Sequence, residues 1–232
     1  MEYAIFPLGD SALLIEAGKI VDAGSQQAIR NIDILLESAS PAWMIETVPA
    51  FTTVTVIYDA VAITFNEAKE ELMNLLKGVA EVAVPPTRTV EIPVCYGGVH
   101  GPDLEFVAKH NGLNADEVIQ IHTGESYTIH MIGFAPGFPY LGGMSERIAA
   151  PRKETPRVRI PERSVGIAGN QTGVYPISTP GGWQLIGRTP IRLFLPEKDI
   201  PCLLRAGDKI TFRSISSDEY QALEEKENAN HM

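Results

Sequence analysis

From Tyr127 onward, glycine and proline divide the chain into short β-type segments, and this pattern excludes folds built from long helices. Turn residues spaced so closely suit antiparallel strands joined by tight connections. We therefore predict an antiparallel β-barrel or sandwich for this part of the chain. The predicted strands are YTIHMIG, SVGIAG, GVYPIS, GWQLIG, PIRLFL and KITFRSI, all between Tyr127 and Ile215.

An N-terminal part with a different pattern precedes these segments. Thr64 and Glu67 have the spacing of a capping box that starts a helix, and Gly78 is placed to end it. An earlier helix is predicted by apolar residues at helical spacing. The order strand, helix, strand, strand, helix, strand is that of a ferredoxin-like unit. The predicted strands cover residues 11–17, 43–48, 52–59 and 81–84, and the earlier helix covers residues 25–38.

The paired prolines Pro85 and Pro86 indicate a boundary between the two parts. We predict an α+β chain with a ferredoxin-like domain at residues 1–86 and a β-barrel domain at residues 87–232. The second domain opens with a strand at 88–96 and two short helices, and it ends in a polar tail that we expect to be a fraying helix. The two short helices are predicted at residues 102–112 and 114–124.

Charge and composition exclude several classes of function. The formal net charge of −10 argues against nucleic-acid binding, and no apolar run approaches the length of a membrane helix. The N-terminus lacks a basic leader, so we expect no signal peptide. Cys95 and Cys202 lie far apart and suit buried thiols in a reducing cytoplasm, which is the expected location. The histidines never fall in a metal-ligand spacing, so we expect no metal site.

The run GFAPGFPYLGGM, from Gly133 to Met144, combines four glycines, two prolines and three aromatic rings without a charge. Such a run breaks helices and interrupts central strands, yet it is too apolar for a plain linker. We expect Phe134, Pro136, Phe138 and Tyr140 to line one side of a groove. His130 lies in the predicted strand that leads into this run, so it is a candidate proton donor or acceptor.

Arginine is concentrated between residues 151 and 190 of this acidic chain. Guanidinium groups match carboxylates or phosphates, which suggests a site for an anionic ligand, although pairing with surface carboxylates would also explain them. Trp183 is either a core residue or a stacking platform. Gln171 lies in GNQTG, which fits a β-turn or a phosphate-binding turn. The arginines are Arg152, Arg157, Arg159, Arg163 and Arg188.

Several catalytic motifs are absent from the sequence. It has no GxxxxGK[ST] phosphate-binding loop, no GxGxxG between a strand and a helix, and no GxSxG nucleophile elbow. These nucleotide-binding and serine-hydrolase motifs therefore do not indicate the function of the chain.

Four longer motifs together resemble one family. GFAPGFPYLGGM, PR…TPRVRIP, SVGIAGNQTGVYP and STPGGWQLIGRTP are similar, in this order, to the B subunit of bacterial 5-oxoprolinase. This family is also labelled KipI or allophanate hydrolase subunit 1, and its likeness covers nearly the whole chain. The resemblance implies a ferredoxin-like domain followed by a cyclophilin-like β-barrel. A related pair of domains forms the carboxyltransferase part of urea carboxylase.

The resemblance also implies partners and an activity. Members of this family work with a homologous second subunit and a lactam-hydrolase subunit to open 5-oxo-L-proline to L-glutamate with ATP, whose binding the subunits would share. We expect His130, Arg157 and Arg188 as catalytic residues of such a site. The groove for substrate or partner would be lined by Phe134, Pro136, Phe138, Tyr140, Arg152, Gln171 and Trp183.

One branch of the family implies a different function. It is known as an inhibitor of a sporulation histidine kinase and acts on the dimerisation region of that kinase. Aromatic and arginine residues are frequent anchors of protein interfaces, so the same groove would serve a binding module that does no chemistry. The sequence leaves both functions open.

Overall fold

Two capping boxes start the helices of the N-terminal unit, Met1–Pro86. The carboxylate of Asp22 accepts a hydrogen bond from Ser25 N at 2.8 Å and starts α1 (Ala23–Ala39). Thr64 and Glu67 form the predicted box and start α2 (Phe65–Leu75). A 3-10 helix, η1 (Leu76–Glu81), continues α2, so the prediction that Gly78 ends the helix is wrong.

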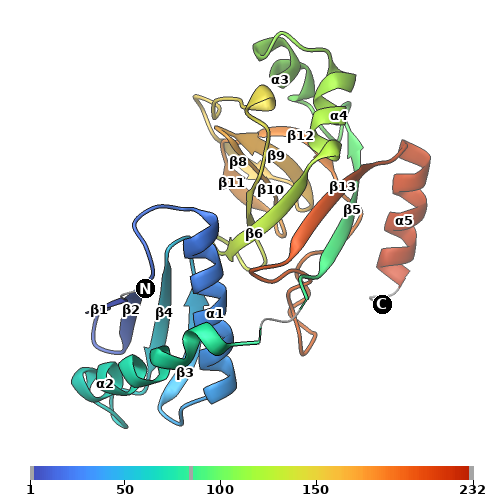
Figure 1. Cartoon of the computed structure of the whole chain (residues 1–232). Coiled ribbons are helices and arrows are strands. Elements are labelled where there is room, and N and C mark those ends of the chain that lie inside the picture. The colour runs from blue at the N-terminus through green and yellow to red at the C-terminus, as the bar shows by residue number, and fades with distance from the viewer. Residues whose placement is uncertain (1–2, 84–85, 230–232) are drawn as a thin grey trace. The chain divides into compact units, whose positions relative to one another are not determined.

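The computed structural model describes residues 3–83 and 86–229. Among residues 3–83, four antiparallel strands form one sheet in the order β1-β2-β4-β3. Alternate residues of β4 are buried, and they pack with apolar residues of α1 and α2 into one core (Figure 1). The strands are β1 (Ala4–Pro7), β2 (Ala12–Glu16), β3 (Met44–Pro49) and β4 (Thr53–Tyr58).

The prediction of a strand at residues 81–84 is wrong for residues 81–83, which the structure describes. Glu81 ends η1, residues 82 and 83 form no strand, and residue 84 lies outside the described residues. A strand that was not predicted from the sequence, β1, pairs antiparallel with β2 instead. In a ferredoxin-like unit the last strand of the sequence occupies the edge beside β2. Here β1, at the start of the sequence, occupies that edge, so the four-stranded sheet is kept with a different edge strand.

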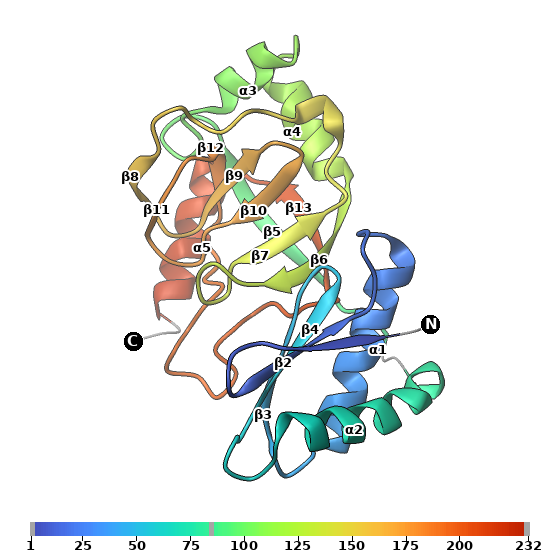
Figure 2. The ribbon, with the colours of Figure 1, turned by 90° about the vertical axis from the view of Figure 1, so that its left-hand side faces the viewer.

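Among the described residues of the second unit, seven strands form one sheet in the order β10-β9-β12-β5-β13-β6-β7. The end strands β10 and β7 lie against each other, so the sheet is nearly closed into a barrel (Figures 1 and 2). A short ribbon of β8 (Arg157–Ile160) and β11 (Thr179–Gly181) forms a separate pair. The barrel strands are β5 (Thr89–Tyr96), β6 (Ser126–Ile132), β7 (Pro139–Gly142), β9 (Ser164–Ala168), β10 (Gln171–Val174), β12 (Gln184–Arg188) and β13 (Lys209–Ser214).

The α+β class and the barrel are therefore confirmed, but several strands differ from the prediction. Strands β8 and β11 were not predicted, and the predicted strand GVYPIS is a strand only as far as Val174. The predicted strand PIRLFL is wrong, because residues 190–195 form a loop whose one β-type pairing is the isolated bridge between Phe194 and Cys202 among the described residues. The run Gly133–Met144 contains a strand, β7, which was not predicted. Pro139, the first residue of β7, is tolerated because β7 is an end strand of the sheet.

Helices α3 (Leu104–His110) and α4 (Ala115–Gly124) lie near one end of the barrel (Figure 1). Both were predicted, and Asn114 caps α4 by accepting a hydrogen bond from Glu117 N. The tail forms α5 (Ser217–Ala229), which packs on β5 through buried Tyr220. No helix within residues 3–83 and 86–229 is long and apolar enough to span a membrane.

A polar chain crosses the barrel core at His122, which is fully buried. Thr172 donates its hydroxyl proton to the carbonyl of Gly166, so it can only accept from His122 Nε2, 2.8 Å away. His122 Nδ1 therefore accepts from the hydroxyl of Tyr96 at 2.7 Å. Burial lowers the pKa of His122 to about 3, so the imidazole is neutral. The hydroxyls of Tyr96 and Thr172 and both ring nitrogens of His122 are then all hydrogen-bonded.

Candidate functional site

Five aromatic rings from distant parts of the chain meet around Phe138. We call them the aromatic cluster: Phe134, Phe138, Tyr140, Tyr175 and Trp183. The ring centroid of Phe138 lies 5.3 Å from Tyr140 and 5.7 Å from Trp183, with the rings edge to face. Edge-to-face pairs are favourable beyond the area they bury, so the cluster is a rigid apolar surface.

The aromatic cluster lies on the side of the sheet opposite the main core. Along β10, Thr172 bonds His122 and Val174 joins the main core, whereas Gly173 faces the rings. A Cβ atom at Gly173 would stand 3.1 Å from Phe138 and 3.2 Å from Trp183. Because Gly173 has no side chain, the two rings can lie directly on the strand, and a larger residue at position 173 would displace them.

Phe134 is the exposed member of the aromatic cluster. Its side chain is 65% exposed, and its φ of 66° lies in the left-handed region that non-glycine residues rarely adopt. Ala135 N donates to the carbonyl of Gly133 at 2.8 Å, which makes Phe134 the centre of a γ-turn. A strained backbone that holds an apolar ring toward solvent is typical of a binding site.

His130 stands over β7, the strand that carries Tyr140, because β6 has a bulge. Ile129 pairs with Leu141 and Met131 with Tyr140, so His130 is the extra residue between them. A Cβ atom at Gly142 would lie 1.8 Å from His130 Nε2, so the imidazole occupies the space above Gly142. Burial lowers the pKa of His130, which makes the neutral imidazole a proton acceptor at neutral pH.

Tyr175 is a candidate site residue that was not predicted from the sequence. It is 2% exposed and shares the face of Gly173, two residues earlier. Burial raises the pKa of Tyr175 to about 12, although the charges of Arg152 and Arg157 act in the opposite direction. The phenol therefore stays protonated beside two cations, where it can donate a hydrogen bond. Alternation within the segment GVYPIS was the signal that would have placed Tyr175 with Gly173.

Arg157 is held by a buried carboxylate. Its Nη2 atom lies 2.8 Å from Asp103 Oδ1, and Leu185 N donates to Asp103 Oδ2 at 2.7 Å. Burial acts to raise the pKa of Asp103, but the hydrogen bonds from Arg157 and Leu185 outweigh it and lower the pKa below its usual value. Arg157 Nη1 also donates to the carbonyl of Trp183 at 3.4 Å, which ties the guanidinium to the aromatic cluster.

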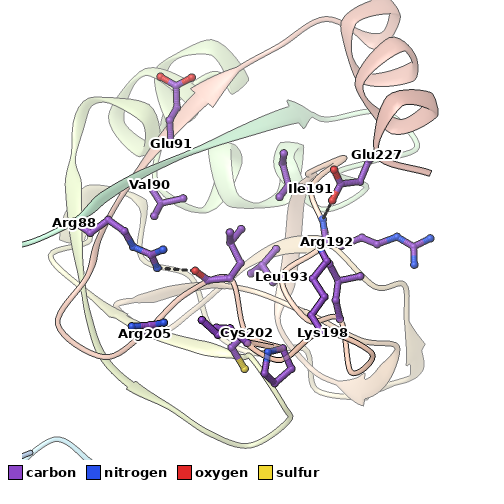
Figure 3. Close-up of a pocket in the computed structure, with 14 residues that line it drawn as sticks. Arg88, Val90, Glu91, Ile191, Arg192, Leu193, Lys198, Cys202, Arg205 and Glu227 are labelled. Atoms are coloured by element: carbon purple, nitrogen blue, oxygen red, sulfur yellow. Dashed lines mark hydrogen bonds between the residues drawn. The ribbon is translucent and has the colours of Figure 1, made fainter. Parts of the chain in front are cut away.

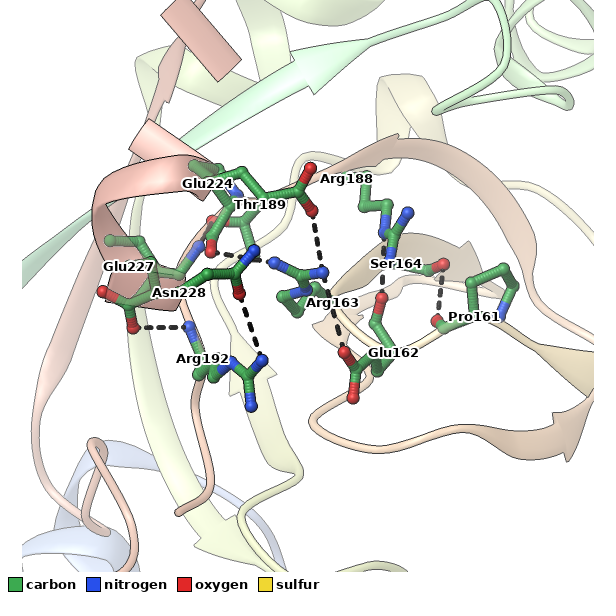
Figure 4. A network of polar contacts seen from close by, with 12 residues as sticks. Pro161, Glu162, Arg163, Ser164, Arg188, Thr189, Arg192, Glu224, Glu227 and Asn228 are labelled. Carbon is green, nitrogen blue, oxygen red and sulfur yellow. Dashed lines mark hydrogen bonds and ion pairs between the residues drawn. The ribbon is translucent and has the colours of Figure 1, made fainter. Parts of the chain in front are cut away.

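Arg188 is not part of this group. Its Nε atom donates to the carbonyl of Glu162 at 3.0 Å, and its charge acts on His100 (Figure 4). Arg188 follows Trp183 by five residues along β12, which is roughly 16 Å of strand. Arg157 lies on β8 and bonds Asp103, whereas Arg188 ends β12 and bonds the Glu162 carbonyl. The expectation that both act in one catalytic site stays a prediction.

The remaining predicted residues fall around the aromatic cluster. Pro136 is exposed in the turn that follows Phe134, and Arg152 is exposed near Tyr175. Gln171 is half-buried at the start of β10, where it pairs with Ala168. Within residues 3–83 and 86–229, no three His, Cys, Asp or Glu side chains gather as metal ligands.

The arrangement supports acid–base chemistry on a small anion. It combines a neutral imidazole, a protonated phenol and a guanidinium held by a carboxylate, all around an apolar surface. A guanidinium binds a carboxylate or phosphate, the phenol donates to a carbonyl oxygen, and the imidazole accepts a proton. These are the groups of a site for transfer chemistry at an amide or carboxylate.

Comparison with known proteins agrees with this fold. The sequence profile of the carboxyltransferase domain, subdomain C and D, matches residues 3–204. The structure of the protein TTHA0988 has a TM-score of 0.78 and 33% identity, covering 89% of this chain and 40% of that one. The structure of urea carboxylase from Kluyveromyces lactis has a TM-score of 0.75 and 18% identity, covering 97% of this chain and 23% of that one. This match supports a similarity of fold and nothing more.

The chain is thus a carboxyltransferase-type protein with a barrel of the cyclophilin-like kind. A protein of Bacillus subtilis (strain 168), named as the B subunit of 5-oxoprolinase, is 50% identical to it over 98% of this chain and 99% of its own length. The chain belongs to the family of 5-oxoprolinase B subunits.

Proposed function

We propose that this chain is the B subunit of an ATP-dependent 5-oxoprolinase that opens 5-oxo-L-proline to L-glutamate. It would act with a homologous second subunit and a lactam-hydrolase subunit, and ATP binding would be shared among them. The observation that carries this proposal is the full-length match to a relative named as the B subunit of 5-oxoprolinase. The groups around the aromatic cluster suit the substrate, a small ring that bears one amide and one carboxylate.

Each group has a role in this proposal. Arg157 binds the substrate carboxylate, and its orientation is fixed by Asp103. Tyr175 donates a hydrogen bond to an oxygen of the substrate or of the phosphoryl group. The rings of the aromatic cluster cover the apolar edge of the lactam and keep water from it.

His130 has the proton-transfer role. The lactam oxygen attacks the γ-phosphorus of ATP, ADP leaves, and His130 accepts the proton that the lactam nitrogen loses. The product is a phosphorylated imidate. Water adds to its carbon, the ring C–N bond breaks as the nitrogen is protonated, and a second water hydrolyses the resulting acyl phosphate to glutamate and phosphate. Arg152, which forms no salt bridge within residues 3–83 and 86–229, is available for phosphoryl oxygens.

Reconstitution tests this proposal. The chain is combined with the second subunit and the lactam-hydrolase subunit, and glutamate release from 5-oxoproline is measured with and without ATP. We expect Arg157→Ala to lower the rate by roughly 10- to 100-fold, the equivalent of one charge-assisted hydrogen bond. Arg159→Ala is the matched control, because Arg159 is exposed on the same strand and bonds only Ser178 among the described residues. Full activity of Arg157→Ala contradicts the assigned role, and absence of ATP-dependent glutamate in wild type contradicts the function.

The exposed ring of Phe134 also suits a second function, inhibition of a sensor histidine kinase by binding its dimerisation region. A protein anchor needs an apolar side chain that is accessible before binding, and Phe134 is 65% exposed. The chain is added to a purified sensor kinase, and autophosphorylation is measured. Inhibition that Phe134→Ala abolishes supports this function, and unchanged autophosphorylation at micromolar protein contradicts it.

A further inference from the structure

A pocket of about 820 Å³ lies in the C-terminal unit and shares no residue with the aromatic cluster (Figure 3). Its walls come from the start of β5, from the segment between β12 and β13, and from Glu227 of α5. The volume is that of a site for a small organic molecule. Neither the proposed enzyme function nor the kinase alternative uses this pocket.

Backbone hydrogen bonds hold one wall of the pocket in place. Leu195 N donates to the carbonyl of Pro201 at 2.8 Å, and Leu203 N donates to the carbonyl of Leu193 at 2.9 Å. These bonds, with the bridge between Phe194 and Cys202, fold residues 193–203 back on themselves. This wall is therefore held in a defined conformation by backbone hydrogen bonds.

Four basic side chains line the pocket, and two of them are occupied by the protein. Arg88 donates to the carbonyl of Leu203 and pairs with Asp208. The guanidinium of Arg192 donates to Asn228 Oδ1 at 3.1 Å. Both guanidinium groups are therefore hydrogen-bonded to the protein, although Arg192 Nε has no partner among the described residues.

The other two basic side chains, Lys198 and Arg205, are uncompensated. Both are exposed, and neither forms a salt bridge or a side-chain hydrogen bond with any residue in 3–83 and 86–229. In the view of Figure 3 they stand on opposite sides of Cys202. The acidic neighbours of Lys198 along the chain, Glu197 and Asp199, do not line the pocket.

The acidic side chains that do line the pocket are engaged. Glu91 pairs with Arg213 at 2.8 Å, and Glu227 accepts a hydrogen bond from Arg192 N at 3.2 Å. Two cations in a chain of net charge −10 are therefore left facing a pocket that also has apolar lining residues. The apolar lining residues are Val90, Ile191, Leu193, Leu195, Ile200 and Leu203.

We propose that this pocket binds a small organic anion, in which a carboxylate or phosphate group is attached to an apolar body. Lys198 and Arg205 bind the anionic group, and the leucine and isoleucine side chains cover the body. A cation pair without a protein partner favours an oxyanion, and the apolar wall selects organic anions over inorganic ones.

Cys202 provides the reporter for the test. It lines the pocket, whereas Cys95, the other cysteine of the chain, is 6% exposed. The full chain is alkylated with iodoacetamide, and modification of the Cys202 peptide is followed by mass spectrometry. Burial raises the pKa of Cys202, so the reaction is run at alkaline pH, where the thiolate forms. The probes are phenyl phosphate, hexanoate, inorganic phosphate and hexanol, at ionic strength matched with sodium chloride.

We expect phenyl phosphate or hexanoate to slow alkylation of Cys202 saturably. In the double variant Lys198→Ala/Arg205→Ala, the apparent dissociation constant should rise at least about tenfold. The double variant Lys109→Ala/Arg147→Ala removes the same charge from exposed positions outside the pocket and should behave like wild type.

Three results overturn the proposal. The first is that neither organic anion protects Cys202. The second is equal protection by hexanol, which removes the role of the cations. The third is equal protection by inorganic phosphate, which removes the role of the apolar wall.

Discussion

Arg157 Nη2 lies 2.8 Å from Asp103 Oδ1, and this ion pair joins the start of α3 to the aromatic cluster. Asp103 is 7% exposed, and its second oxygen accepts from Leu185 N. One buried carboxylate therefore fixes both a barrel strand and the guanidinium that we assign to the substrate. Asp103 is a positioning residue, because it acts through Arg157.

The first prediction concerns this carboxylate. Asp103→Asn removes the charge that orients Arg157 but keeps an oxygen for Leu185 N–H. We expect the KM for 5-oxoproline in the reconstituted enzyme to rise about tenfold, with a smaller change in kcat. Asp116→Asn, at an exposed acidic residue in the first turn of α4, is the control. An unchanged KM in Asp103→Asn would show that Arg157 needs no such support.

The second prediction is a pH dependence of stability caused by His122. Its pKa is about 3 in the folded chain and 6.5 in the unfolded chain, so between these values only the unfolded chain binds the proton. The contribution of His122 is complete above pH 6.5 and is lost as the pH falls toward 3. We expect the free energy of unfolding to drop by about 1.4 kcal/mol for each pH unit within this window.

Chemical denaturation between pH 7 and pH 5 measures this slope. Burial also lowers the pKa values of His100 and His130, so their contributions have the same sign. The variant His122→Asn isolates the buried group, and its slope should be smaller than that of wild type. His110→Asn, at an exposed histidine, should leave the slope unchanged. Equal slopes in wild type and His122→Asn would contradict the assignment.

The third prediction concerns the space above Gly142. In Gly142→Ala the new methyl group would stand 1.8 Å from His130 Nε2, so the imidazole must leave its position. We expect the rate of the reconstituted enzyme to fall by at least about tenfold, because a displaced general base no longer reaches the proton. Gly124→Ala is the control, since a Cβ atom there meets nothing within 4 Å. Thermal unfolding separates loss of function from loss of fold.

The features that could be predicted from the sequence are those that depend on local patterns, such as helix starts and the barrel class. The capping box at Thr64 followed from side chains three residues apart. Their geometry is complete within one turn of helix, so no distant contact can change it. The barrel class followed in the same way from turn residues and alternation.

The site depends on pairings that local patterns do not contain. Tyr175 meets Phe138 only because β10 and β7 close the sheet, and His130 lies over Gly142 of β7 only because β6 has a bulge. The edge strand β1 was missed for the same reason, since four residues gain strand structure from pairing with β2. The ion pair of Arg157 with Asp103 spans 54 residues, and no spacing in the sequence indicates it.

The last prediction concerns the attachment of α5 to the barrel. Arg163 is 6% exposed, and its Nη2 atom lies 2.8 Å from Glu224 Oε1 of α5 (Figure 4). Glu224→Gln leaves the buried guanidinium without its nearest charge, which we expect to cost about 1.5–3 kcal/mol in the free energy of unfolding of the helix. Amide hydrogen exchange of residues 217–229 should therefore speed up by roughly 10- to 100-fold. Glu225→Gln, at the exposed neighbouring position, should leave exchange unchanged. Equal protection of α5 in Glu224→Gln and wild type would mean that Tyr220 and the apolar contacts hold the helix without this ion pair.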